Sequence, residues 1–230
     1  AKTILKKIKS MGSVRNVAGM ARYGINTEGA LGISLPALRK MAREIGRDHK
    51  LAQALWASKI HEARILAGLV DEPALVTERQ LERWALDFDS WDVCDLVCSN
   101  LFDRTPWAYR KAHEWSARKE TFVKRAGFVL MAALSVHDKT APDAAFTQFL
   151  PVIRREAGDD RNFVKKAVNW ALRQIGKRNP ALNRAAVRAA RGIQRLDTRS
   201  ARWIAADALR ELTSAKILAM IRRKKAVRRG

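Results

Sequence analysis

Cysteine is scarce in this 230-residue sequence, which holds only Cys94 and Cys98. Because these two residues are four positions apart in a helical pattern, their side chains share one helix face. We expect both thiols to fill the same part of a core rather than to form a disulfide or hold a metal. A chain with so little cysteine suits a reducing compartment, and we predict a cytoplasmic protein.

Long apolar runs are also absent. Residues 65–70 form one of the longest, which is far short of the roughly 20 apolar residues of a membrane-spanning helix. Residues 1–10 lack the apolar segment of a secretory signal. We therefore expect no membrane segment and no export. Apolar residues still make up 47% of the chain, which is enough for a packed core.

Signatures of metal sites and of activated nucleophiles are missing as well. The four histidines are scattered, and none has a second kind of metal ligand at helical spacing. The sequence contains no glycine-rich phosphate loop, no nucleophile elbow and no Ser/His/Asp pattern. These absences exclude most enzyme classes, and we expect neither a metal nor another cofactor.

Acidic residues are scarce in the last third of the chain. Residues 161–230 carry 20 basic and 3 acidic side chains, a net charge of +17, whereas residues 1–160 carry 25 and 20, a net charge of +5. Such one-sided charge repels itself unless a polyanion neutralises it. Nucleic acid is therefore the leading partner, and an anionic membrane is a weaker alternative. A basic surface that only keeps the protein in solution is less favoured, because mixed signs serve solubility better.

Apolar residues recur at intervals of three and four along the whole chain, which is the period of amphipathic helices. Ser34, Thr105 and Asn179 stand shortly before prolines, where helices commonly begin. No segment shows a convincing strand pattern. We predict helices at roughly 35–46, 59–70, 77–86, 90–102, 106–117, 120–134, 142–156, 161–176, 181–193 and 200–212.

One segment of the chain is repeated. Residues 122–126, Phe-Val-Lys-Arg-Ala, recur 41 residues later as Phe-Val-Lys-Lys-Ala at 163–167. Two-helix HEAT-type repeats have periods of about 40 to 47 residues and stack into a solenoid with a concave face. We therefore predict an all-α fold, a curved solenoid of antiparallel HEAT-like helical repeats. It should form a single domain over residues 1–220, followed by a basic C-terminal tail at residues 221–230.

Four arginines step by four, three and four residues near the predicted helix at 181–193. They are Arg184, Arg188, Arg191 and Arg195, and we call them the arginine stripe. Like charges at this spacing repel along a bare helix, whereas contacts with phosphates reverse that cost. We expect the stripe to bind nucleic acid. The basic tail is less informative, because charged termini are often only solvated.

The segment Asp89–Asp95 combines groups that can act on a substrate. Trp91 and Asp95 are four residues apart, so an indole and a carboxylate project together. They lie beside the apolar helix face of Cys94, Val97, Cys98 and Leu101. Trp170 follows Lys166 by one helical turn, which again places an aromatic ring beside a cation. Taken alone, such tryptophans are more often packing residues, and such an aspartate is more often a salt-bridge partner. Their combination with a polyanion-binding surface favours a functional role.

Several short segments form a series along the chain. They are Ala21-Arg22-Tyr23 with residues 32–39, Leu55-Trp56 with residues 61–64, Ser90-Trp91-Asp92 with Asp95, residues 124–126, and residues 166–173 followed by Asn179-Pro180. In their order and approximate spacing they resemble the DNA alkylation-repair glycosylases that are built from HEAT-like helical repeats. The resemblance runs through most of the chain, which makes it more specific than any single segment.

The resemblance implies hydrolysis of the N-glycosidic bond of purines made cationic by alkylation at N3 or N7 in duplex DNA, without flipping the base. It makes Asp95 the catalytic carboxylate, and it makes Trp91 and Trp170 the aromatic residues that hold the sugar of the damaged nucleotide. The expected DNA contacts are Tyr23, Arg39, Lys124, Arg125, Lys166, Arg173 and the arginine stripe. We expect a nucleoid-associated monomer whose partner is duplex DNA, with no obligate protein partner.

The chemistry suits these residues. A cationic alkylpurine leaves as a neutral base, so no general acid is needed. One ionised carboxylate can stabilise the positive charge that develops on the sugar and orient the attacking water. Each indole face can add cation–π stabilisation of about 0.5 to 2 kcal/mol. Ser90 departs from the family, which has a second indole before the aspartate, so affinity or lesion range can differ.

Three alternatives stay open from the sequence. The first is a non-catalytic HEAT-like module that binds DNA or RNA through a basic concave face. The second is a protein-binding scaffold, whose binding should be insensitive to salt, whereas binding to phosphates weakens steeply as salt rises. The third is a lyase with a lysine nucleophile, although no lysine is distinguished by its surroundings.

Overall fold

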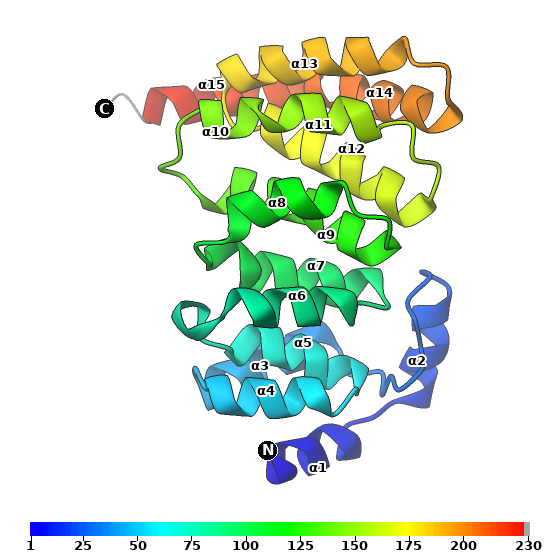
Figure 1. Ribbon diagram of the computed structural model, residues 1–230, viewed down its shortest axis with the longest axis vertical. Helices are drawn as coiled ribbons and strands as arrows, with labels where there is room; N and C mark the ends of the chain where they lie inside the picture. The colour runs from blue at the N-terminus through cyan, green and yellow to red at the C-terminus, as the bar shows by residue number, and fades with distance from the viewer. Residues whose placement is uncertain (228–230) are drawn as a thin grey trace. The chain divides into compact units, whose positions relative to one another are not determined.

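The computed structural model describes residues 1–227, with side chains through Arg223, and this part of the chain contains helices but no strand (Figure 1). In chain order the elements are α1 (Lys2–Ser10), α2 (Val14–Ala21), α3 (Leu35–Ile45), α4 (His49–Ala57), α5 (His61–Val70), the 3-10 turn η1 (Pro73–Leu75), α6 (Glu78–Leu86), α7 (Trp91–Asn100), the 3-10 turn η2 (Phe102–Arg104), α8 (Ala108–Ser116), α9 (Thr121–His137), α10 (Ala144–Thr147), α11 (Phe149–Glu156), α12 (Asn162–Gly176), α13 (Pro180–Gln194), α14 (Arg199–Leu212) and α15 (Ala215–Val227).

The ten helices expected from the sequence are present, and most of their boundaries agree within two residues. The segment expected at 142–156 is divided into α10 and α11. The sequence did not predict α1, α2, α4 or α15. The first two have little apolar surface to reveal them, since α1 buries only Ile8 and α2 buries no residue. Asn179 caps α13 as expected, because its side-chain oxygen accepts the backbone N–H of Leu182 at 2.9 Å.

The chain divides into two compact units, Ala1–Trp107 and Ala108–Gly230. The single domain expected over residues 1–220 stays a prediction. Of the basic tail expected at 221–230, residues 221–227 belong to α15, and residues 228–230 lie outside the described part of the chain. None of the helices within residues 1–227 has both the length and the apolar composition that a bilayer span needs.

The first unit packs α4 and α6 on one side of α5 and α7 (Figure 1). The indoles of Trp56 on α4 and Trp84 on α6 stack face to face, with ring centroids 4.0 Å apart and planes 2° apart. The guanidinium of Arg64 on α5 lies 5.3 Å from the centroid of the Trp56 ring. The stacking joins α4 to α6 within one layer, and the cation–π contact joins that layer to α5.

The second unit has two layers, one of α8, α11 and α13 and the other of α9, α12 and α14 (Figure 1). The repeated sequence segments open α9 and α12, which are neighbours in the same layer. Phe122 and Phe163, the first residues of the two copies, have ring centroids 5.3 Å apart. The 41-residue spacing therefore marks equivalent helices in successive helix pairs.

Gly127 allows α8 and α9 to approach closely in the second unit. A Cβ at this position would lie 2.5 Å from the backbone nitrogen of Ser116 and 2.9 Å from its Cα. Neither backbone atom can move without shifting α8, so only glycine fits here.

Replacing Gly127 with alanine should therefore lower the free energy of unfolding by about 1–3 kcal/mol through overpacking. Gly19→Ala in α2 is the matched control, because a Cβ there meets no atom within 4 Å. The control should leave stability unchanged or raise it by about 0.5–1 kcal/mol. Urea denaturation of the three proteins measures both effects, and equal behaviour of the two variants would contradict the close approach.

Candidate active site

A cavity of about 940 Å³ lies among α2, α3, α5 and α7 in the first unit. Three residues predicted from the sequence line it: Tyr23, Trp91 and Asp95. Trp91 and Asp95 lie one turn apart on α7, and both are partly buried. Tyr23 follows α2 and is 76% exposed. The structure thus brings an indole, a phenol and a carboxylate to one hollow within a single unit.

The indole of Trp91 is attached to the segment that follows α2. Its Nε1 donates a hydrogen bond to the backbone carbonyl of Tyr23 at 3.1 Å. This bond joins residues that are 68 positions apart in the chain and limits rotation of the indole. The hydrogen bond therefore favours one orientation of the ring at the cavity.

A buried carboxylate organises the loop on the other side of the cavity. Glu62 on α5 is 1% exposed, and its oxygens accept three backbone N–H groups. The distances are 2.8 Å from Leu31, 2.6 Å from Gly32 and 3.2 Å from Ile33. Gly32 has a φ of +79°, and a Cβ there would lie 2.3 Å from the carbonyl oxygen of Ser13. The loop can therefore wrap around the carboxylate only with glycine at this position.

An ion pair between His61 and Asp92, which both line the cavity, joins α5 to α7. The Nε2 of His61 lies 2.8 Å from Oδ2 of Asp92. Ser90 donates its hydroxyl to the other oxygen of Asp92 at 2.6 Å, and it accepts the backbone N–H of Asn26 at 3.2 Å. Ser90 is fully buried. The hydroxyl of Ser90 thus links the loop to α7.

The pKa values of this pair move in opposite directions. Burial disfavours the charged form of His61, but the hydrogen bond and the charge of Asp92 outweigh it, so the pKa of His61 is raised above 6.5. Burial likewise opposes ionisation of Asp92, but the hydrogen bonds from His61 and Ser90 outweigh it, so the pKa of Asp92 is lowered below 3.8. Both directions favour a charged histidine facing a charged aspartate.

The second unit holds the other residues expected at the site. Trp170 and Lys166 lie on α12; the tryptophan is partly buried and the lysine is exposed. Arg173, also on α12, donates to Glu211 at 2.6 Å. The structure therefore places Trp170 and Lys166 together on one helix, while Trp91 and Asp95 belong to the first unit.

Two expected DNA contacts have their charged groups directed into the protein. Lys124 on α9 is 8% exposed and pairs with Glu156 at 2.5 Å and with Asp159 at 3.0 Å. Arg125, 6% exposed, donates to the carbonyl of Phe163 at 2.6 Å. These bonds fix the start of α9 against its neighbours. A direct contact of either side chain with DNA stays a prediction, as it does for Arg39, which is exposed on α3 of the first unit.

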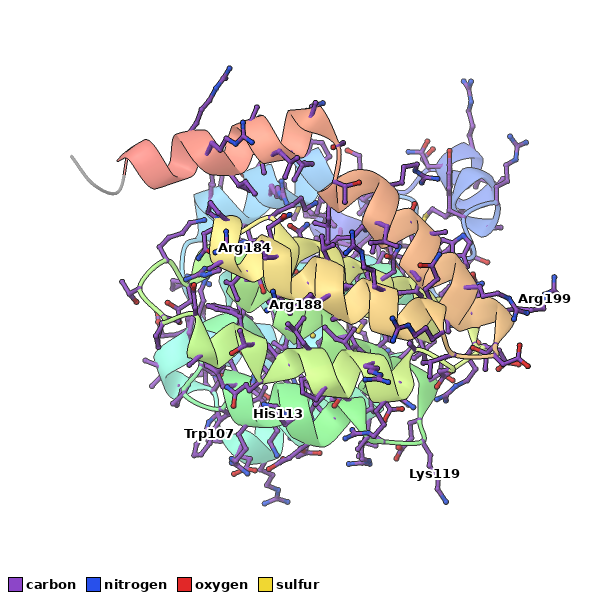
Figure 2. All side chains as sticks on the ribbon, turned by 90° about the horizontal axis from the view of Figure 1, so that it is seen from above. Trp107, His113, Lys119, Arg184, Arg188 and Arg199 are labelled. Atoms are coloured by element: carbon purple, nitrogen blue, oxygen red, sulfur yellow. The ribbon has the colours of Figure 1, made fainter. Side chains whose placement is uncertain are left out.

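Three residues of the arginine stripe lie on α13, and the fourth, Arg195, is its C-terminal cap; all four side chains are exposed. Figure 2 shows Arg184 and Arg188 along α13, with Arg199 at the start of α14. α13 belongs to the layer of α8 and α11, whereas Trp170 and Lys166 belong to the layer of α9 and α14. Within the second unit, the stripe is therefore on a different layer from these two predicted site residues.

Glu62, His61, Asp92 and Asn26 contribute to the cavity or its support, and residue-by-residue reasoning did not select them. The sequence did point to these residues, because His61 and Glu62 belong to one of the segments that carry the family resemblance and Asp92 belongs to another. What the sequence could not show is that the two segments bond to each other. The side chains of Cys94 and Cys98 are both buried on α7, as expected.

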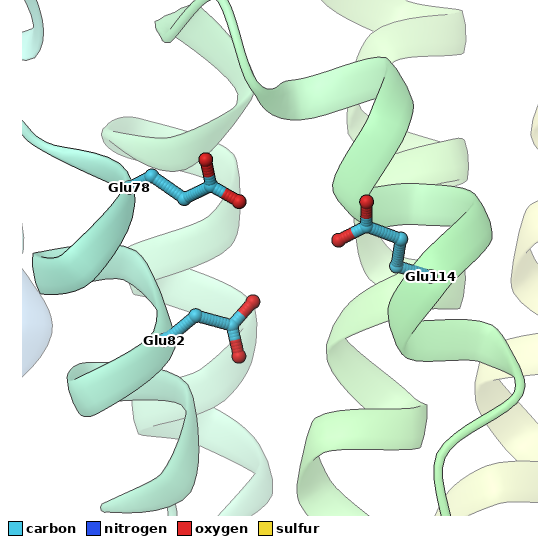
Figure 3. Close-up of side chains that lie close together, drawn as sticks. All are labelled: Glu78, Glu82 and Glu114. Carbon is cyan, nitrogen blue, oxygen red and sulfur yellow. The ribbon is translucent and has the colours of Figure 1, made fainter.

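Three glutamates shown in Figure 3 belong to different units, Glu78 and Glu82 to the first and Glu114 to the second. Within the second unit, the carboxylate of Glu114 accepts hydrogen bonds from Lys111 at 2.6 Å and Arg110 at 2.8 Å. These bonds lower the pKa of Glu114. Neither unit therefore contains all three of these glutamates.

The opposed pKa shifts predict a pH-dependent contribution of the His61–Asp92 pair to stability. Since the pKa of His61 is raised when folded, its contribution is complete below pH 6.5 and is lost as the pH rises through the raised value. Substituting His61→Gln should cost about 1–3 kcal/mol near neutral and mildly acidic pH and less at alkaline pH. Urea denaturation across this range measures the difference. A constant difference would show that folding does not raise the pKa of His61, and an Asp92→Asn background should remove the stabilisation at acidic pH.

Comparisons with known proteins identify the family and the fold. Residues 4–212 match the model of a family described as DNA alkylation repair enzyme. No curated protein matches the chain. A solved structure superposes with a TM-score of 0.75 and 19% identity, over 91% of this chain and 94% of that chain. It represents a new family of proteins related to the HEAT-like repeat DNA glycosylases, with affinity for branched DNA structures. That likeness shows a HEAT-like repeat fold. Because the family match spans nearly the whole sequence, the chain belongs to the DNA alkylation repair enzyme family.

Proposed function

We propose that this protein is a monofunctional DNA glycosylase that hydrolyses the N-glycosidic bond of cationic N3- or N7-alkylated purines in duplex DNA, without flipping the base. The observation that carries the proposal is the shared cavity of Trp91 and Asp95 in a member of a DNA alkylation repair family. We propose Asp95, Trp91 and Trp170 as catalytic residues. No metal or other cofactor enters this mechanism.

Asp95 supplies the one charge that the reaction needs. As the bond between sugar and base lengthens, the alkylated purine loses its positive charge and the deoxyribose gains it. A carboxylate beside the sugar stabilises this developing cation and holds a water molecule for attack at the anomeric carbon. The base departs neutral, so no protonated side chain has to assist it. Neutral lesions such as uracil lack this advantage and should be poor substrates.

The two tryptophans act on the same developing charge through their ring faces. A cation near an indole face is stabilised by about 0.5–2 kcal/mol, and only the part that grows in the transition state accelerates the reaction. The hydrogen bond from Trp91 to the Tyr23 carbonyl fixes the ring in advance, so little reorganisation is needed. Trp170 is partly exposed on α12, which leaves ring surface available for a sugar.

Contacts with the DNA backbone are proposed for the exposed residues of the predicted set. Tyr23, Arg39 and Lys166 are accessible to phosphates in the structure as it stands. Arg173 is held by Glu211, and Lys124 and Arg125 stabilise the start of α9. For these three, we propose that their main effect on DNA binding is to position the helices.

Asp95→Asn should reduce the single-turnover release of 7-methylguanine from duplex DNA by about 100- to 1,000-fold, because the variant cannot stabilise the sugar cation. Asp89→Asn is the matched control: this carboxylate is 50% exposed, lies 3.5 Å from Arg64 and does not line the cavity. The control should keep wild-type release. Circular dichroism and a thermal melt verify that both variants are folded, and an equal loss in both would refute the role of Asp95.

The rate of base release in Trp91 variants should fall as the replacement side chain interacts more weakly with a cation. Trp91→Phe should slow release by a few-fold and Trp91→Leu by up to about 30-fold, which corresponds to about 2 kcal/mol. Binding of undamaged duplex should change little in either variant, because the effect arises in the transition state. Equal rates for the phenylalanine and leucine variants would show that the ring serves only as packing.

A second candidate function is a non-catalytic module that binds DNA. One observation favours it: the solved structure with the same fold represents proteins with affinity for branched DNA. This function predicts tight, salt-sensitive DNA binding with no base release by the wild-type protein. The assay that tests Asp95 therefore separates the two functions.

A further inference from the structure

The arginine stripe on α13 is uncompensated by acidic residues. Arg184, Arg188, Arg191 and Arg195 are all exposed, and none has an ionic partner among the side chains that the structure describes. Residues 180–196 contain no Asp or Glu. Several other arginines of the second unit are paired; for example, Arg161 lies 2.6 Å from Asp159. Four unpaired like charges on one helix face lower its stability unless an external anion binds.

A groove of about 760 Å³ borders the stripe between α11 and α13. Arg188 lines it from α13, and Arg154 and Arg155 line it from α11. Arg154 extends across α13, so that its Cζ lies 3.7 Å from the position of a Cβ on Gly192. The guanidinium of Arg154 thus lies beside α13 and adds a fifth cation next to the stripe. The floor of the groove is apolar, with Leu150, Pro151, Ala185 and Ala189.

The buried and exposed faces of α13 are opposite each other. Its buried residues include Leu182, Ala186, Ala190 and Ile193, which pack into the second unit. The arginines recur at the same helical spacing on the other face and point to solvent. From Arg184 to Arg195 the helix rises about 16 Å. A DNA duplex carries one phosphate charge per about 1.7 Å of its axis, so the stripe is long enough to meet several phosphates.

The composition of this surface favours a nucleic-acid backbone over a membrane. Peripheral membrane helices combine basic residues with large apolar side chains that enter the lipid. The large apolar residues that are exposed in the described part of the chain are Met11, Val14, Tyr23, Leu75, Leu86, Val136 and Trp203, and none of them lies on α11 or α13. The stripe is interspersed with alanines instead. A surface of arginines and small residues can lie close to phosphates without inserting into anything.

We propose that the α11–α13 face is a second DNA-binding surface, which holds the sugar–phosphate backbone of a duplex arm other than the one at the catalytic residues. The layer assignment supports this separation. Lys166 and Trp170 lie on α12, in the layer of α9 and α14, whereas the stripe lies on α13, in the layer of α8 and α11. A duplex that contacts one layer leaves the other available to a second duplex segment, as at a branch point.

The test compares a linear duplex with a three-way DNA junction. The variant R184Q/R188Q/R191Q/R195Q removes four charges from the stripe. The control K2Q/K6Q/K9Q/K50Q removes four charges from exposed lysines of the first unit. We expect the stripe variant to bind the junction about 10- to 100-fold more weakly than wild type, with a shallower dependence on salt. Its affinity for the linear duplex should stay within about 3-fold of wild type. The control should have the same ratio of junction affinity to linear-duplex affinity as wild type.

Other outcomes overturn the proposal in distinct ways. Equal losses of affinity for the junction and for the linear duplex would show that the stripe belongs to the same DNA-binding surface as the catalytic residues. Unchanged junction binding, with lost affinity for RNA or for an acidic protein, would assign the surface to that other partner. Release of 7-methylguanine from linear duplex is measured in the same variants. If release is absent in wild type while the junction effect is present, only the proposed glycosylase activity fails. If release is intact and the junction effect is absent, only the second surface fails.

Discussion

The buried carboxylate of Glu62 is the constraint on which the cavity depends. A carboxylate without water around it must be satisfied by donors, and here the backbone N–H groups of residues 31–33 supply them. This requirement bends the loop, and the bend in turn requires a glycine at position 32. The next residue toward the N-terminus, His61, bonds to α7 through Asp92. A single turn of α5 therefore positions both the loop and the helix that carries Trp91 and Asp95.

Local patterns predicted much of this molecule because they depend on properties that repeat along a helix. The period of apolar residues located ten of the helices, and the 41-residue repeat identified α9 and α12 as equivalent. The four-residue spacing of Trp91 and Asp95 correctly placed both side chains at one cavity. The short helices α1 and α2 were missed because they bury almost nothing, so no apolar pattern marks them.

Long-range pairings could not be predicted from one sequence. Lys124 looked like a DNA contact by its position, but Glu156 and Asp159, more than 30 residues away, engage its ammonium group. Nothing near position 124 indicates those partners. The same limit applies to Ser90, whose hydroxyl joins Asn26 to Asp92 across 64 residues. The sequence also could not show which layer of helices carries the arginine stripe. The spacing of residues along one helix does not reveal which other helices pack against it.

The tie between the Trp91 indole and the Tyr23 carbonyl has a thermodynamic consequence for ligand binding. Residues 22–34 form an irregular segment, and such segments usually lose conformational entropy when a ligand orders them. Here the Trp91 bond anchors one end of the segment, and the bonds to Glu62 anchor the other. The entropy is lost during folding, before any DNA arrives. Less of the free energy of DNA binding is then lost in ordering the wall of the cavity. More of it remains to stabilise the sugar and its leaving group.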